Sequence, residues 1–264
     1  MQDRQPPKSG EVIASTIGMN LVYIPAGEFR MGGSGSAAQL AARYDGNEAY
    51  FTNEYPQHRV RISRGFWMSQ TEVTQGQYQA VMGSEPWLEK TYVQRADYNP
   101  AVFVSWDDAV AFCERLGRKE GQTYQLPTEA QWEYACRAGT TTQYNFGEDE
   151  STSEEYAWFK GNTLDIGEAY AQPVGLLKPN AFGLYDMHGN VWEWCRDYYD
   201  PQYYRKLGEP AIDPENSRPA PCRVLRGGCW YYAPQYGRSS YRGGSTPGTR
   251  RNCRIGFRVI RVDS

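Results

Sequence analysis

The sequence predicts a single α+β domain with little regular secondary structure. Its 264 residues, 40% of them hydrophobic, can bury one full core but are too few for two ordinary domains. Aromatic residues make up 14% of the chain, and Gly (27) and Pro (16) are frequent, a mixture typical of irregular backbone held by large rings. Helical and strand-like patterns both occur, without an internal repeat.

The first quarter of the chain is expected to contain a tail and short strands. Residues 1–17 are polar and interrupted by Pro and Gly, so we expect a polar N-terminal tail, with the domain covering 18–264. Residues 20–31 predict two short strands around a Pro-Ala-Gly turn. Residues 32–53, rich in Gly, Ser and Ala, are expected to form a loop. The alternating residues 58–62 predict a strand with which residues 65–68 can pair.

Three helix starts carry capping-box patterns, in which a Ser or Thr hydroxyl and a side chain three residues later satisfy the first backbone amides. The apolar spacing predicts helices over 106–117 and 129–137, and Gly139 ends the second one. After Gly139, Gly, Pro, Asn and Asp interrupt every run, and no long helix is expected. The three capping pairs are Thr74/Gln77, Ser105/Asp108 and Thr128/Gln131.

Charge is distributed unevenly along the chain. Residues 216–262 contain ten arginines and no Asp or Glu, although the whole chain has a net charge of −3. This segment can form an anion-binding surface, or it can pair with the acidic remainder of the same domain; the absence of a linker favours internal pairing. A sequence pI of 5.6 argues against nucleic-acid binding.

The chain lacks two kinds of apolar segment. No stretch reaches the roughly 18 uncharged apolar residues that a membrane span requires. The first residues also lack the apolar region of a signal peptide, although a processed precursor would have lost it. We therefore expect a soluble chain whose compartment is unknown.

Seven ordered stretches, spread over roughly residues 18–262, resemble the formylglycine-generating enzyme family, also called sulfatase-modifying factors. The resemblance implies the family's variant of the C-type lectin fold, which has little regular secondary structure. The family includes oxidases that convert a substrate cysteine to formylglycine, sulfoxide synthases, pigment-maturation enzymes and ligand-binding proteins. The matching stretches are 24–32, 71–74, 100–106, 126–134, 180–194, 223–228 and 255–258.

The family's oxidases hold Cu(I) with two cysteines five residues apart, because soft thiolates select that ion. The matching positions in this chain are Tyr232 and Gly237, so copper is not expected at them. Cys229 and Cys253 are weak candidates for a rearranged catalytic thiolate pair; the alternatives are packed small residues or a disulfide. Cys113 and Cys136, whose disulfide partners in eukaryotic relatives correspond to non-cysteine positions here, are expected to be free buried thiols.

The resemblance also implies a structural Ca²⁺ site. Asp186 and Glu193 supply carboxylate oxygens, and Gly189 and Val191 supply backbone carbonyls, a mixture that calcium prefers. The alternative is a carboxylate-capped turn without metal. The family's other calcium site is not expected, because Trp158 occupies the place of its Asn. His58 and His188 are expected to be structural or solvated, and Trp192 and Trp194 to be core rings.

The segment 229–246 is dense in Tyr, Arg, Ser and Gly, a composition also favoured in binding loops. In the family this segment lines the substrate groove. We expect Arg226 and Arg258 to hold the loop backbone. Some of six other side chains are expected to face a peptide, protein or small-molecule ligand: Tyr231, Tyr232, Tyr236, Arg238, Tyr241 and Arg242.

Two functional hypotheses follow. The first is a calcium-stabilised module that binds a ligand in the C-terminal groove without copper chemistry. The second is an oxidoreductase of the formylglycine-generating type with rearranged metal ligands. The sequence favours the first hypothesis because the copper cysteines are absent.

Overall fold

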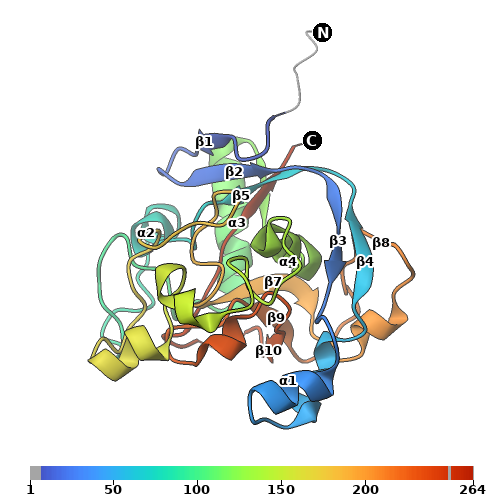
Figure 1. Ribbon diagram of the computed structural model, residues 1–264. Helices are drawn as coiled ribbons and strands as arrows, with labels where there is room; N and C mark the ends of the chain where they lie inside the picture. The colour runs from blue at the N-terminus through green and yellow to red at the C-terminus, as the bar shows by residue number, and fades with distance from the viewer. Residues whose placement is uncertain (1–6, 249–250, 264) are drawn as a thin grey trace, which may run out of the picture.

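The computed structural model describes residues 7–248 and 251–263, which form three small sheets and four α-helices joined by loops and 3-10 turns (Figure 1). The mixture of helices and short strands confirms the α+β prediction. The helices are α1 Ala37–Arg43, α2 Gln75–Met82, α3 Trp106–Glu120 and α4 Glu129–Arg137.

The sheets are built from strands that lie far apart in the sequence. The five-stranded sheet has the order β1 Val12–Ala14, β2 Asn20–Ile24, β5 Phe66–Ser69, β12 Ile260–Val262 and β6 Thr123–Gln125. The four-stranded sheet has the order β10 Gly243–Ser245, β9 Arg223–Arg226, β7 Trp192–Tyr198 and β11 Ile255–Gly256. The three-stranded sheet has the order β3 Gly27–Met31, β4 His58–Ile62 and β8 Ala211–Ile212.

The capping boxes begin the helices where they were expected. The hydroxyls of Thr74, Ser105 and Thr128 accept hydrogen bonds from the backbone amides three residues later, and the reciprocal side-chain bonds are present. Helix α4 has the predicted bounds and α3 is three residues longer than predicted. Among the residues described after Gly139, only 3-10 turns and short strands occur, as expected.

Three local expectations are corrected. Residues 32–53 contain α1, which begins with a capping box between Ser36 and Gln39. Strand β4 pairs with β3 and β8 instead of residues 65–68, because β5 joins β2 and β12 in another sheet. Residues 12–14, expected within the tail, form β1 and pair with β2; residues 1–6 lie outside the described part.

The core consists of two large clusters of buried apolar side chains. One includes the rings of Tyr78, Phe112 and Phe257, and the other lies under α4 around Trp132. Helices α3 and α4 lie near the centre of the molecule in Figure 1. Strands β7 and β9 lie between these two helices and the C-terminal loops. These two strands position the site described below.

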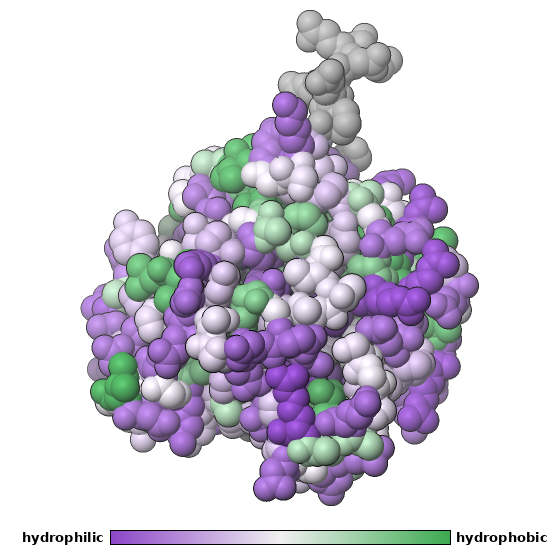
Figure 2. Space-filling model, in the orientation of Figure 1, coloured by the Kyte–Doolittle hydropathy of each residue, from purple (hydrophilic) through white to green (hydrophobic). Residues whose placement is uncertain are grey.

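The face shown in Figure 2 is mostly hydrophilic, with apolar residues in small separate patches. Within the described residues, no helix is long and apolar enough to cross a membrane.

Candidate functional site

The C-terminal loop 229–242 is fixed to the domain by buried arginines. Arg226, on β9, donates to the Glu133 carboxylate and to the backbone carbonyls of Ser239 and Ser240. Arg258 forms two hydrogen bonds with Glu193, at 2.6 and 2.7 Å, and donates to two backbone carbonyls. Both side chains are fully buried. Arg226 holds the loop backbone as expected, whereas the expectation for Arg258 is corrected, because its carbonyl partners, Ser69 and Tyr185, lie outside the loop.

Arg238 and Arg242 are also buried, and the expectation that they face a ligand is corrected. Arg238 forms two hydrogen bonds with Glu54, and Arg242 forms two with Glu129, at 2.6 and 2.8 Å. Each ion pair removes the guanidinium and its partner carboxylate from solvent together. These two arginines hold the loop from below instead of contacting a ligand.

The basic segment 216–262 therefore pairs mainly within its own domain. Six of its arginines form ion pairs in the described part of the chain, five of them with acidic residues that precede the segment. The pairs are Arg226 with Glu129 and Glu133, Arg238 with Glu54, Arg242 with Glu129, Arg251 with Asp108, Arg258 with Glu193 and Arg261 with Asp263.

Four aromatic rings near these buried arginines each contact the next, so that together they form a closed circuit. Tyr232 lies 5.2 Å from Tyr236, Tyr236 lies 5.3 Å from Tyr241, and Trp192 contacts Tyr241 at 5.8 Å and Tyr232 at 6.5 Å, measured between ring centroids. Such tilted and edge-to-face pairs are the favoured arrangements of aromatic rings. The circuit surrounds one pocket, which we call the aromatic pocket.

The aromatic pocket has a volume of about 360 Å³ and opens over the four-stranded sheet. All four strands of that sheet contribute to it: β7 through Trp192, β9 through Leu225, β10 through residues 243–245 and β11 through Ile255. Tyr232, Tyr236 and Tyr241, three of the six predicted ligand contacts, line it. Tyr231 lies outside the lining and is 41% exposed. Trp192, expected only in the core, forms one wall.

Arg254 supplies the cationic group of the aromatic pocket. Its guanidinium lies 4.8 Å from the ring centre of Tyr231 and 5.5 Å from that of Tyr232, and it donates to the Tyr232 hydroxyl at 3.2 Å. Within residues 7–248 and 251–263 it forms no ion pair with a carboxylate. Arg254 was not among the predicted ligand contacts because it lies outside the segment 229–246. The pocket thus combines rings with one cation free to meet an anion.

Two of the predicted calcium residues, Asp186 and Glu193, lie with Glu72 in a buried cluster of carboxylates. Asp186 Oδ2 accepts from the Gly175 amide at 2.7 Å, whereas Oδ1 has no hydrogen-bond partner. Both oxygens of the buried Glu72, a residue that the sequence analysis missed, also lack a partner. Glu193 instead is bound by Arg258 and by the Trp132 indole N–H. Among the described residues, no group of three or more His, Cys, Asp and Glu side chains is arranged to hold a metal ion.

The unpartnered oxygens nevertheless fit a hard cation. Burial, followed by the neighbouring carboxylates, raises the pKa of Glu72 well above its usual range, and burial raises the pKa of Asp186 to about 6. Two adjacent carboxyl groups in a dry interior need either a shared proton or a cation. Glu72 and Asp186 are the residues that would hold calcium, which prefers carboxylate oxygens. A Cβ atom at Gly189 would lie 2.4 Å from the Trp158 carbonyl oxygen. Only glycine therefore allows the backbone to pass this close to Trp158.

The cysteines and histidines of the chain are poor candidates for chemistry. Cys229 is fully buried, and burial raises the pKa of its thiol to about 12; burial also raises the pKa of Cys253. Both are free thiols. Cys113 and Cys136 are free and buried, as was expected for these two residues. These environments disfavour the thiolates that a metal or a nucleophilic reaction requires. His188 is buried and accepts from the Asn145 amide at 3.0 Å, which indicates a structural role.

The sequence profile of the sulfatase-modifying factor enzyme 1-like domain matches residues 12–262. The chain belongs to this family. The formylglycine-generating enzyme of Streptomyces coelicolor is 36% identical over 172 residues, which are 61% of this chain and 52% of that protein. The chain therefore spans about half the length of this relative. Family membership confirms the resemblance drawn from the sequence motifs.

Two solved structures resemble this sulfatase-modifying factor domain over almost its whole length. PvdO from Pseudomonas aeruginosa has a TM-score of 0.81 and 29% identity, covering 97% of this chain and 99% of that one. Treponema denticola variable protein 1 has a TM-score of 0.78 and 26% identity, covering 95% and 98%.

Proposed function

We propose that this chain is a ligand-binding member of the sulfatase-modifying factor family that holds its ligand in the aromatic pocket of a C-type-lectin-like domain. The proposal rests on the residues found at the two positions where the family's oxidases have copper-binding cysteines. Tyr232 lies in the wall of the pocket, and Gly237 is buried. Neither residue offers a thiolate, so the donor set required for Cu(I) is missing at these positions.

The packing around Gly237 supports this proposal independently. A Cβ atom at this position would lie 2.7 Å from the Phe159 ring and 3.1 Å from the Gly227 carbonyl oxygen. Phe159 is itself buried, so its ring cannot move aside into solvent. The place of the second copper cysteine is therefore closed to any side chain.

The chemistry of the pocket favours a ligand with an aromatic or apolar group and a negative charge. The four rings offer stiff contact area that loses little conformational entropy on binding, and Arg254 offers an unpaired cation. The buried arginines beneath the loop fix the rings before a ligand arrives, which lowers the entropic cost of association. A peptide segment that carries an aromatic and an acidic side chain meets these requirements.

Calcium belongs to the proposal as a structural ion. Glu72 and Asp186 would hold it through the oxygens that have no partner among the described residues. When bound, it would supply the positive charge that two buried carboxylates lack and would tie the 71–74 segment to the 186–193 loop. Glu193, committed to Arg258, would act by holding that loop in place.

The test is selection of a random heptapeptide library on the immobilised protein, followed by calorimetry with the enriched peptides. Peptides enriched in aromatic and acidic residues should bind the wild-type protein and bind Tyr241→Ala and Arg254→Gln at least about tenfold more weakly. Tyr50→Ala, which removes an exposed ring outside the pocket, is the matched control. Enriched peptides that bind both pocket variants as well as the wild type would overturn the proposal.

A further inference from the structure

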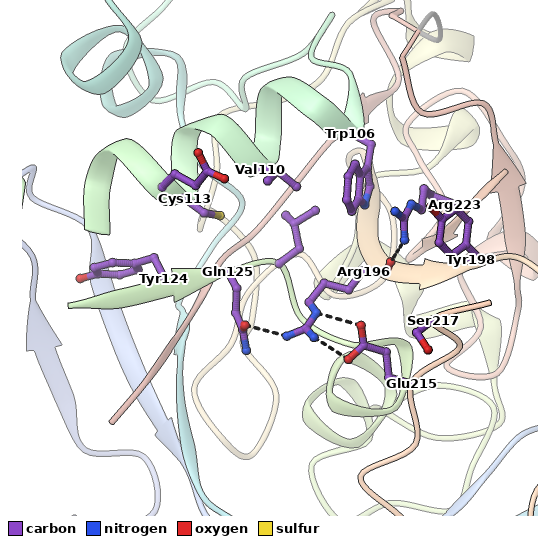
Figure 3. Close-up of a pocket in the computed structure, with 12 residues that line it drawn as sticks. Trp106, Val110, Cys113, Tyr124, Gln125, Arg196, Tyr198, Glu215, Ser217 and Arg223 are labelled. Carbon is purple, nitrogen blue, oxygen red and sulfur yellow. Dashed lines mark hydrogen bonds and ion pairs between the residues drawn. The ribbon is translucent and has the colours of Figure 1, made fainter. Parts of the chain in front are cut away.

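A second pocket lies on a different part of the domain, with its walls on α3, β6, β7 and β9 (Figure 3). Its volume of about 430 Å³ lies within the range of small-molecule sites. It shares no lining residue with the aromatic pocket. Nothing in the proposed function uses it, so its chemistry can be considered separately.

One side of the second pocket is apolar. Trp106, Val110 and Cys113 face it from α3, and Tyr124 and Leu126 come from the β6 segment. Cys113 and Leu126 are buried, whereas Trp106 and Val110 remain partly exposed. This arrangement gives a shallow apolar floor with an open side, where a ring-sized body would remove apolar surface from water.

The opposite side is polar and carries two arginines in different states. Arg196 is satisfied, because it donates to both carboxylate oxygens of Glu215, at 3.1 and 2.5 Å, and to Gln125 Oε1 at 2.6 Å. Figure 3 shows this side chain extended between Gln125 and Glu215. The ion pair therefore builds the wall and leaves no net charge for a ligand.

Arg223 is the unsatisfied cation. Its guanidinium lies between two rings, 3.8 Å from the centre of Trp106 and 3.4 Å from that of Tyr198. Within the described residues it makes one hydrogen bond, from Nη1 to the Arg196 carbonyl, forms no ion pair, and leaves Nε without a partner. The two ring contacts hold the guanidinium in place. Because Nε is itself buried, Nη2 is the group that can bind an acceptor on a ligand.

The other free groups around this wall are also donors. The amide nitrogen of Gln125 and the hydroxyl of the exposed Ser217 have no hydrogen bonds with described residues, while the Glu215 carboxylate is occupied by Arg196. Glu114, at the α3 rim, is exposed and lies 3.9 Å from Arg118. The surplus of donors at the polar side calls for a ligand that accepts hydrogen bonds.

We propose that the second pocket binds a small carboxylic acid with an apolar, ring-sized body. The carboxylate would accept from Arg223, assisted by Gln125 and Ser217, and the apolar body would lie on Trp106 and Val110. A neutral analogue would lose the charge-assisted hydrogen bond, and a carboxylate without an apolar body would lose the contact with the floor.

The experiment titrates the full chain with phenylacetate, phenylacetamide and acetate, using calorimetry and ligand-observed NMR. Phenylacetate should bind the second pocket saturably, with the other two compounds at least about tenfold weaker there. Arg223→Gln should weaken phenylacetate binding about tenfold or more, and Val110→Trp should abolish it by filling the pocket. Arg218→Gln removes an exposed arginine of the same segment that lines neither pocket, and should change nothing.

Two variants separate this site from the aromatic pocket and from misfolding. Phenylacetate binding that Arg223→Gln weakens should persist in the Arg254→Gln background, in which the aromatic pocket has lost its cation; if Arg254→Gln abolishes all binding while Arg223→Gln does not, the ligand lies in the aromatic pocket and the inference is overturned. If near-UV circular dichroism shows that Arg223→Gln does not fold, binding by Val110→Trp tests the second pocket instead. Absence of saturable phenylacetate binding to the wild-type protein, or equal binding by Val110→Trp, would also overturn it.

Discussion

Arg238 and Glu54, 184 positions apart in the chain, form a fully buried two-point ion pair, with Nη1–Oε2 at 2.8 Å and Nη2–Oε1 at 2.6 Å. Ser240 donates to the same carboxylate at 2.6 Å. The pair connects the loop that presents the tyrosines to the 3-10 turn at Thr52–Glu54. The loop is therefore held by charged groups that never meet solvent.

Breaking this pair should destabilise the whole domain. We predict that Arg238→Met lowers the free energy of unfolding by about 3–5 kcal/mol, because Glu54 is left buried without a partner. Urea unfolding followed by Trp fluorescence measures this change. The matched control is Arg59→Met, since Arg59 forms an exposed pair with Glu28 at 2.9 Å and should lose less than about 1 kcal/mol. Equal losses in the two variants would contradict the assignment.

The buried Asp197 should make stability depend on pH. Burial, and then the neighbouring Glu129, raises the pKa of Asp197 to about 7, whereas an unfolded Asp titrates near 3.9. Its contribution is fully present below the unfolded pKa and is lost as the pH rises through the folded pKa. We predict that the wild-type protein loses up to about 4 kcal/mol relative to Asp197→Asn between pH 4 and pH 8.

This prediction is measured as the difference between the unfolding free energies of the two proteins at several pH values. Other titrating groups are common to both proteins, so the difference isolates Asp197. Two backbone amides donate to the two oxygens of the Asp197 carboxylate, at 2.7 and 2.8 Å; Asn keeps one acceptor for them, and the loss of the other bond is the same at every pH. Parallel pH profiles would show that Asp197 does not change its protonation on folding.

Calcium should raise the melting temperature through Glu72 and Asp186. An ion that binds only the folded state adds about 2.7 kcal/mol at a hundredfold excess over its Kd. We predict that differential scanning calorimetry shows this shift for the wild-type protein and for Glu114→Gln, an exposed control. Glu72→Gln and Asp186→Asn should not respond. A calcium shift that survives in both variants, or no shift in the wild-type protein, would contradict the site.

Local chemistry made much of the fold predictable. Three of the four α-helices begin at the capping boxes that the sequence shows, because a capping box involves residues only three apart. The sequence also contains the capping box of Ser36 and Gln39, but the Gly- and Ser-rich composition of residues 32–53 favours a loop there. Helix α1 buries only Ala37 and Leu40, so its apolar face is too small to stand out.

Long-range partners were not predictable. Nothing near Arg238 or Arg242 indicates that Glu54 and Glu129 will bury their charges, so both resembled surface arginines. The pairing of β4 with β3 depends on the direction in which the chain leaves Ile62, which the alternating pattern does not encode. Arg254 and Glu72 were missed for the same reason, because their roles depend on distant residues that the fold brings beside them.

Restoring the two copper positions should not restore copper binding. The variant Tyr232→Cys/Gly237→Cys places thiols where the family's oxidases have them, but the second must displace the buried Phe159 ring. We predict a loss of about 1–3 kcal/mol in stability from overpacking, measured by urea unfolding, and no stoichiometric Cu(I) in anaerobic titration. The matched control is the single variant Tyr232→Cys, which makes no such clash but loses the ring contacts of Tyr232; the double variant should be less stable than this single variant by that amount. Tight one-to-one Cu(I) binding by the double variant would contradict the account.

The most direct test of the central claim is aldehyde formation by the wild-type protein. The protein is incubated with Cu(I), oxygen and a peptide carrying the sulfatase cysteine motif, and the product is examined by mass spectrometry after hydrazide labelling. The account predicts no stoichiometric copper binding and no formylglycine, while the aromatic-acidic peptides still bind the aromatic pocket. Catalytic turnover of the cysteine peptide to formylglycine would contradict it.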